Sequence, residues 1–316
     1  MLINLSFLDG KEMVAANVAM GIVFFSQTLV GILGNCSLLL HYFMSVFTEK
    51  SLMPKDQILK HVTFANFLSV ISRGIPQTMA EFGLKYFLDD FVCKLIIYSN
   101  RVSRGISLYT MCILSCFQAI TISSSSPKWM KLKHRMTKYI NPSCSVSWLV
   151  HLFLNSKVTM RVTSLGNNRN FTKKFNFGHC SGFGLDNIAG KFYLFLICFT
   201  DFLYLSLMAW ASISMLSILY RHKKQMQYIH SAQHCPRVSP EARATQAVLI
   251  LLCIFVFFNS MSFLQLLYIT LCDNPKLWLI SILSFLDTCF PTSCPFLFIS
   301  SNGYISRIYF PSCRNK

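Results

Sequence analysis

Charged residues are scarce in this chain, and acidic residues are the scarcest. Lys, Arg, Asp and Glu make up 13% of the 316 residues, and only 12 of them are Asp or Glu. Ordinary soluble domains carry roughly 25% charged residues, so the composition excludes a typical soluble globular protein. The chain also lacks Gly-x-Ser-x-Gly, P-loop and His-Glu-x-x-His motifs. We therefore expect no catalytic site, no cofactor and no enzyme activity.

The sequence also shows neither a cleavable signal peptide nor an internal repeat. Asp9, Lys11 and Glu12 precede the first apolar run, so we expect this run to act as its own signal anchor rather than as a cleavable signal peptide. The two halves of the chain show no internal repeat, which argues against transporters built from inverted repeats.

Apolar residues, in contrast, are abundant. They make up 53% of the chain, with 29 Phe, and apolar runs of the roughly 20–25 residues needed to cross a bilayer recur seven times. The sequence therefore predicts an all-α membrane protein, a bundle of seven transmembrane helices in one domain. The expected spans are residues 14–43, 57–79, 94–122, 139–158, 192–220, 244–271 and 276–300, followed by a short tail at 301–316.

The basic residues indicate how the chain lies in the membrane. The formal net charge of +17 comes from short segments between the apolar runs, a pattern that fits topology and anionic lipid better than nucleic acid. Lys and Arg are most frequent near residues 50–55, 128–138, 221–243 and 307–316. Because short basic segments stay inside, we expect an outer amino terminus and a cytoplasmic carboxyl terminus.

The stretch 93–128 carries two arginines one helical turn apart. Arg101 and Arg104 lie roughly 12 and 16 Å along the helix from Cys93, at 1.5 Å per residue. At about 100° per residue they share a stripe of mostly small or polar residues, and bulky residues occupy the opposite stripe. The shared stripe comprises Arg101, Arg104, Gly105, Leu108, Cys112, Ser115 and Ala119. This pattern predicts a buried helix whose small face packs against its neighbours.

Charges inside a bilayer are by default functional or paired. Asp287, eight residues before Pro295, should reach a depth similar to that of Arg101 and Arg104. We expect these three residues to line a ligand cavity, although pairing of the arginines with Asp287 alone remains open. Interhelical ion pairs or contact with lipid headgroups are equally plausible for Arg73 and Asp201.

Two cysteines and two glycosylation motifs fall on the expected outer side. Cys93 and Cys180 are the natural oxidised pair in that compartment, with two unrelated free thiols as the alternative. The triplets that begin at Asn170 and Asn4 are glycosylation acceptors.

A possible metal site lies in a basic segment. His230 and His234 are four residues apart and precede Cys235, but the nearby Lys and Arg residues would repel a cation. We expect a solvated loop and no metal.

Several strings resemble heptahelical, rhodopsin-like G-protein-coupled receptors, with characteristic substitutions. Phe64-Ala65-Asn66 stands where that family has Leu-Ala-Asp, Phe117-Gln118-Ala119 where it has Asp-Arg-Tyr, and Cys294-Pro295 where it has Asn-Pro. These substitutions, together with Ser72-Arg73-Gly74-Ile75-Pro76, are similar to those of the type 1 vomeronasal receptors. The resemblance covers essentially the whole chain.

The resemblance implies a pheromone or odorant receptor of sensory neurons, in the plasma membrane, that activates a heterotrimeric G protein of the inhibitory class. We expect a small volatile or steroid-like ligand to enter from outside among the third, fifth, sixth and seventh helices. Arg101 or Arg104 would then supply a charge-assisted hydrogen bond, Tyr268 would help to bury the apolar body of the ligand, and Leu108 is also expected at the ligand site. The residues expected to contact the G protein are Gln118, Lys128, Lys131, Arg221, Lys223 and Lys224.

Two alternatives remain open. Bitter-taste receptors also lack Asp-Arg-Tyr, although the Ser-Arg-Gly-Ile-Pro and Phe-Gln-Ala-Ile-Thr strings argue against them. A small-solute transporter or channel would use the intramembrane charges as an ion path, but Asp201 and Asp287 alone give it thin support.

Overall fold

The computed structural model describes residues 2–47, 53–84, 88–123, 127–157, 162–164, 174–176, 180–183, 188–229, 240–271 and 277–301. The helices are α1 (Leu2–Phe47), α2 (Pro54–Ser69), α3 (Ile75–Glu81), α4 (Asp90–Ile122), α5 (Pro127–Asn155), α6 (Ile188–Ile229), α7 (Pro240–Leu271) and α8 (Leu277–Ser301). A single π-helical segment, η1 (Val70–Gly74), joins α2 to α3 without a break. Because α2, η1 and α3 form one continuous rod, the described part of the chain contains seven helical rods, and the predicted seven-helix architecture is confirmed.

Several of these helices are long and apolar enough to cross a membrane. Within the described residues, four stretches are both long and apolar enough: Ala15–Ser45, Asp90–Ile122, Phe195–Ile218 and Trp278–Ile299. In α7 the described residues contribute a shorter apolar stretch, Leu252–Leu264. The more polar α5 contains most of the span expected at 139–158, up to Asn155.

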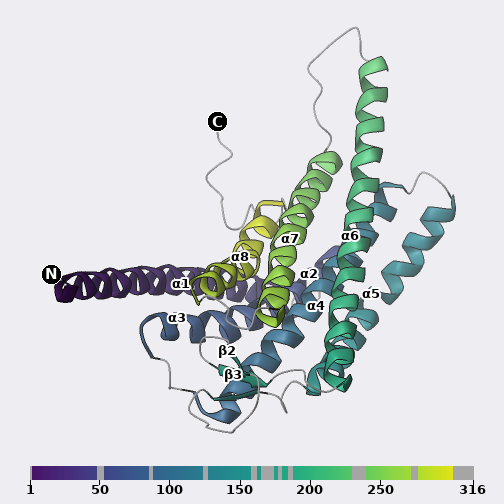
Figure 1. Cartoon of the computed structure of the whole chain (residues 1–316). Helices are drawn as coiled ribbons and strands as arrows, with labels where there is room; N and C mark the ends of the chain where they lie inside the picture. Colours follow the sequence, from purple (N-terminus) through teal and green to yellow (C-terminus); the bar gives the residue numbers. More distant parts are fainter. Residues whose placement is uncertain are drawn as a thin grey trace.

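Two helices are longer than expected. Residues 128–138, expected to form a loop, are the first turns of α5, which begins at Pro127. Proline is tolerated at the start of a helix, and the next proline is Pro142, so no early residue breaks this helix. Helix α6 likewise continues past residue 220 to Ile229 and extends beyond its neighbours at the top of Figure 1.

Helix α4 lies at the centre of the bundle. It packs against α2, α5, α6, α7 and η1, and in Figure 1 it runs between α5 and α6 on one side and α1, α7 and α8 on the other. Neighbouring helices therefore bury both the stripe of small residues and the stripe of bulky residues on α4. Val102 and Ile106, on the bulky stripe, are 3% and 0% exposed, and Leu108, on the small stripe, is 0% exposed.

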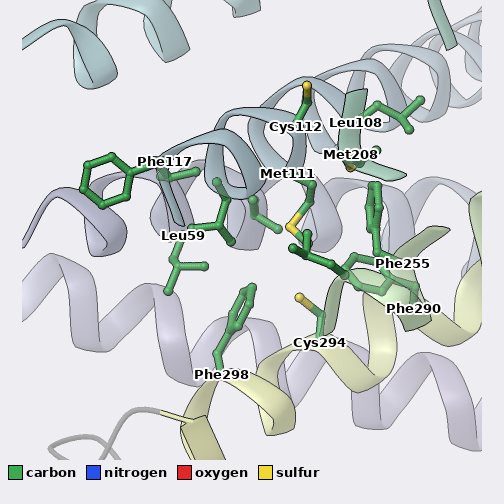
Figure 2. Close-up of a cluster of buried hydrophobic side chains, with 14 of the residues drawn as sticks. Leu59, Leu108, Met111, Cys112, Phe117, Met208, Phe255, Phe290, Cys294 and Phe298 are labelled. Atoms are coloured by element: carbon green, nitrogen blue, oxygen red, sulfur yellow. The ribbon is translucent and has the colours of Figure 1, made fainter. Parts of the chain in front are cut away.

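A large apolar cluster fills the half of the bundle toward the carboxyl end of α4. Leu108, Met111 and Phe117 of α4 meet residues of α1, α2 and α5 to α8 in this cluster. Figure 2 shows Phe255 of α7 and Phe290 of α8 beside Met111, and the two rings pack edge to face with centroids 4.6 Å apart. Apolar packing between these helices therefore holds this half of the bundle together.

The π-helical segment has a local cause. Pro76 has no N–H, and its ring would clash with the carbonyl of residue 72 in a regular α-helix. Widening of the helix over Val70–Gly74 is one way to relieve that clash. Gly74 then lies against α1 so closely that a Cβ atom at this position would overlap Thr28 Oγ1.

Asn35 joins α1 to α8 at the point where α8 lacks a backbone donor. Pro295 has no N–H, so the carbonyl of Pro291 cannot receive its usual helical hydrogen bond. Asn35 Nδ2 donates to that carbonyl at 2.9 Å, and also to the Gly31 carbonyl at 2.8 Å. Asn35 is fully buried, so its amide satisfies an acceptor that water cannot reach.

We predict that Asn35→Leu destabilises the protein by about 1–3 kcal/mol, the cost of leaving a buried acceptor unsatisfied. Thermal unfolding of the purified protein in detergent measures this effect. Ser26→Ala is the matched control, because Ser26 is exposed on the same helix and its hydroxyl donates only within α1, to the Val23 carbonyl. Equal melting temperatures for Asn35→Leu and Ser26→Ala would contradict the proposed role of Asn35.

Candidate functional site

A disulfide ties a small sheet to the start of α4. Cys93 and Cys180 are bonded, with their Cα atoms 5.9 Å apart, and both are fully buried. The three strands are β1 (Val162–Ser164), β2 (Lys174–Asn176) and β3 (Cys180–Phe183), antiparallel in the order β1-β3-β2. Because β3 carries Cys180 and β1 packs on α4, the bond fixes the sheet over one end of the bundle. Figure 1 shows β2 and β3 at this end.

A polar cavity lies between α4, α5 and α6, in the half of the bundle that carries the disulfide. Its volume is about 50 Å³. The lining residues used below are Arg101, Arg104 and Gly105 of α4, His151 and Asn155 of α5, and Asp201 of α6. Helices α5 and α6 each pack against α4 but have at most marginal contact with each other, which leaves the space between them.

The charges of this cavity are incompletely paired. Arg104 Nη2 lies 3.3 Å from Asp201 Oδ2, and the two side chains are 17% and 11% exposed. Nε and Nη2 of Arg104 are nevertheless buried and have no hydrogen-bond acceptor among the described residues. Arg101 forms no salt bridge or hydrogen bond within the part of the chain that the structure describes. The cavity thus contains two guanidinium groups and one carboxylate, which among the described residues pairs with Arg104 alone, so the cavity is electropositive.

Helix α5 supplies a polar wall that faces these charges. His151 is 5% exposed, and its Nδ1 lies 2.8 Å from the Ser147 carbonyl. A carbonyl only accepts, so Nδ1 carries a proton and donates to it. The imidazole lies directly against Gly105, where a Cβ atom would overlap His151 Cδ2. The absence of a side chain at Gly105 therefore leaves room for the ring.

Asp287 belongs to a different polar group, between η1, α7 and α8. Its Oδ2 lies 2.6 Å from Arg73 Nη1, and its Oδ1 accepts a hydrogen bond from Ser262 Oγ of α7. Arg73 Nη2 also donates to Ser284 Oγ at 3.2 Å. Among the described residues Asp287 thus pairs with Arg73, and the carboxylate beside Arg104 is Asp201, so the expected pairing of the arginines with Asp287 is not seen. That Asp287 lines a ligand cavity stays a prediction. Asp287 faces Arg73 because the π-helical segment carries Arg73 toward α8.

Two other residues expected at the ligand site lie elsewhere. Leu108 is fully buried in the apolar cluster, and Tyr268, on α7, is not part of the cavity lining. This cavity is formed by α4, α5 and α6, the third, fourth and fifth rods of the bundle, whereas the ligand site was expected among the third, fifth, sixth and seventh. Asn170 lies outside the described residues, and Asn4 lies in the first turn of α1.

The residues expected to meet the G protein gather at the opposite end of the bundle. Gln118 is partly buried near the end of α4, whereas Lys128 and Lys131 are exposed at the start of α5. Arg221 and Lys224 are exposed toward the end of α6, and the side chain of Lys223 lies outside the described set. The tail at 302–316 and the segment from His230 to Cys235 are also outside it.

His151 and Asn155, which line the cavity, are not among the site residues expected from the sequence. Their spacing of four residues places both on one face of α5, and this spacing was the signal that could have identified a polar wall. Glu81 of α3, whose Oε1 accepts from Gln77 Nε2 at 2.9 Å and from Ser281 Oγ at 2.7 Å, is not among the expected residues either.

The architecture is that of a heptahelical membrane receptor. It has seven helical rods, a disulfide that fixes a small sheet at one end, and a cavity with charged residues just inside that end. Sequence comparison identifies which kind. A family model described as the vomeronasal organ pheromone receptor family matches residues 18–311. The chain belongs to this family.

Individual relatives agree with this assignment. Vomeronasal type-1 receptor 4 of Homo sapiens is 42% identical over 298 residues, which cover 94% of this chain and 99% of that receptor. Vomeronasal type-1 receptor 1 of Homo sapiens is 40% identical over 98% of this chain and 87% of its own length. A more distant relative, olfactory receptor class A-like protein 1 of Danio rerio, is 30% identical over 89% of each chain.

Family membership decides between the alternatives that the sequence left open. The protein is a vomeronasal-type chemosensory membrane receptor with a ligand and a G protein as its general partners. It belongs to a receptor family and not to an enzyme family. Bitter-taste receptors and transporters are correspondingly not its class.

We predict that the Arg73–Asp287 pair behaves as one energetic unit. Asp287→Leu leaves a cation buried without its partner and should cost about 3–5 kcal/mol, whereas Arg73→Met with Asp287→Leu should cost clearly less than the sum of the two single changes. Thermal unfolding of the four proteins provides the double-mutant cycle. Arg221→Ala, which removes an exposed cation, should change the melting temperature little. Additive effects in the cycle would show that the pair is not coupled.

Proposed function

We propose that this receptor detects a small volatile or steroid-like ligand from outside the cell and signals through a heterotrimeric G protein of the inhibitory class. The observation that carries the proposal is the electropositive cavity between α4, α5 and α6, placed in the half of a receptor bundle that carries the disulfide. In this cavity Arg101 and Arg104 present guanidinium groups for a charge-assisted hydrogen bond. The surrounding apolar helices supply the rest of the contact.

Activation follows from a shift between two arrangements of the bundle. A ligand favours whichever arrangement it binds more tightly, and α6 contributes both Asp201 to the cavity and Met208 and Met215 to the apolar cluster. A change in the position of α6 at the cavity is thereby transmitted to α7 through the cluster, which also contains Phe255. The inner ends of α6 and α7 then separate and admit the G protein.

The docking surface for the G protein is the end opposite the disulfide. Its exposed cations, Lys128, Lys131, Arg221 and Lys224, attract an acidic partner and speed its association. Gln118, at the place where rhodopsin-like receptors carry an arginine, has no charge. An inner ionic lock through this residue is therefore excluded.

We predict that Arg221→Ala with Lys224→Ala lowers ligand-stimulated nucleotide exchange on an inhibitory G protein roughly threefold or more, because both cations lie on the docking surface. Membranes that contain equal amounts of surface receptor and a fixed amount of heterotrimer give the measurement. Lys157→Ala, an exposed cation near the disulfide end of α5, is the control and should behave as wild type. If Lys157→Ala lowered nucleotide exchange more than the double variant, the docking surface would lie at the disulfide end, which would contradict the proposal.

The proposed orientation, with the amino terminus outside and the receptor in the plasma membrane of sensory neurons, makes a second prediction. Asn170, and with it Asn4, would face the compartment where glycans are added. Asn170→Gln should remove a glycosidase-sensitive increase in apparent mass. The buried sequon at Asn35 is the internal control and should carry no glycan. A protein without glycan at either outer position, but with one on an introduced cytoplasmic sequon, would reverse the orientation.

A further inference from the structure

The cavity between α4, α5 and α6 contains more positive than negative charge. Arg101 and Arg104 contribute two cations, and Asp201 is the one carboxylate in the lining. Because Arg104 is the residue within ion-pair distance of Asp201, Arg101 is the cation left without an ion-pair partner in the described part of the bundle. An isolated charge removed from water is unfavourable, so a single additional negative charge would complete this site.

The shape of the available donors favours one anion. A guanidinium group presents its N–H donors in a planar fork that matches a carboxylate. Arg104 also has a buried nitrogen, Nε, without a hydrogen-bond acceptor among the described residues, whereas its Nη2 faces Asp201 in the ion pair. One unpaired cation matches a monoanion better than a dianion. The donors and the charge together fit a carboxylate.

The size of the cavity limits the rest of the ligand. Its volume of about 50 Å³ is roughly a third of the ~150 Å³ that holds a benzene molecule in a protein cavity. By that comparison the space holds little more than a carboxylate group, so the apolar remainder of a ligand extends beyond it. His151 forms part of the wall and is pressed against Gly105, so its ring sets how far a chain can extend toward α5.

We infer that the cavity between α4, α5 and α6 binds the carboxylate group of a carboxylic acid in its anionic form. Arg101 is the counter-ion, Arg104 is a second donor whose charge Asp201 partly neutralises, and His151 is the residue that limits chain length. The inference rests on the proposed receptor function and names the ligand class of that site. It narrows the volatile or steroid-like ligand to a carboxylic acid.

Direct binding to the full-length receptor in lipid nanodiscs tests the inference without a G protein. The probes are propanoate, the neutral isostere propanamide and octanoate. Propanoate should bind, and propanamide should bind at least tenfold more weakly. Arg101→Gln should weaken propanoate binding about 10- to 100-fold, the range expected for hydrogen bonds to a charged group. Lys94→Gln, on the same helix but outside the cavity lining, is the matched control.

Two further variants separate binding from misfolding. Asp201→Asn removes the competing carboxylate and should strengthen propanoate binding, a change opposite in sign to that of Arg101→Gln. His151→Ala enlarges the cavity and should shift the preference from propanoate toward octanoate, whereas Leu152→Ala, on the exposed side of α5, should not.

Equal binding of acid and amide, absence of acid binding by folded receptor, or unchanged binding in Arg101→Gln overturns the assignment of the ligand class. A different result would contradict the proposed signalling function while leaving the ligand assignment unaffected. A receptor that binds propanoate as described but never stimulates nucleotide exchange on any G protein would contradict the signalling role and leave the binding site intact.

Discussion

Charge inside an apolar bundle is the constraint that organises this receptor. Each buried cation needs an anion within reach, since isolated charges are strongly unfavourable in a membrane. Arg73 meets Asp287 at 2.6 Å and Arg104 meets Asp201 at 3.3 Å. The first pair ties η1 to α8 and, through Ser262, to α7. The second ties α4 to α6. Together the two pairs connect helices on both sides of the bundle.

Helix α4 is where these connections meet the apolar core. Its first half carries the disulfide and the two arginines, and its second half carries the residues of the large apolar cluster. Figure 1 shows it between the two groups of helices, and Figure 2 shows Met111 close to Phe255 and Phe290 of α7 and α8. A change at the cavity therefore has a continuous packed route to the opposite end. That division, polar near the disulfide and apolar beyond it, suits a protein that receives a ligand at one end and a partner at the other.

Much of the fold follows from apolar periodicity and proline. The number of helices, the central position of α4 and the Cys93–Cys180 bond agree with what the sequence indicates. The charge pairings do not follow from it. Periodicity places a side chain on its own helix, but the neighbour it faces depends on how the helices pack and, for Arg73, on the π-helical segment before Pro76. The same limit explains why the sequence does not identify His151 as a residue that lines the cavity.

The most direct test of the account is the chemical accessibility of the cavity in the intact membrane. Thr200 lines the cavity on α6, and Thr200→Cys places a thiol there with little change in size. Small thiol reagents of opposite charge, added outside the cell, would be compared with the wild-type background from the native cysteines. The account predicts that the anionic reagent reacts faster than the cationic one, and that Arg101→Gln reduces this difference. Faster reaction of the cationic reagent, or reaction only from the cytoplasmic side, would contradict an electropositive cavity open to the outside.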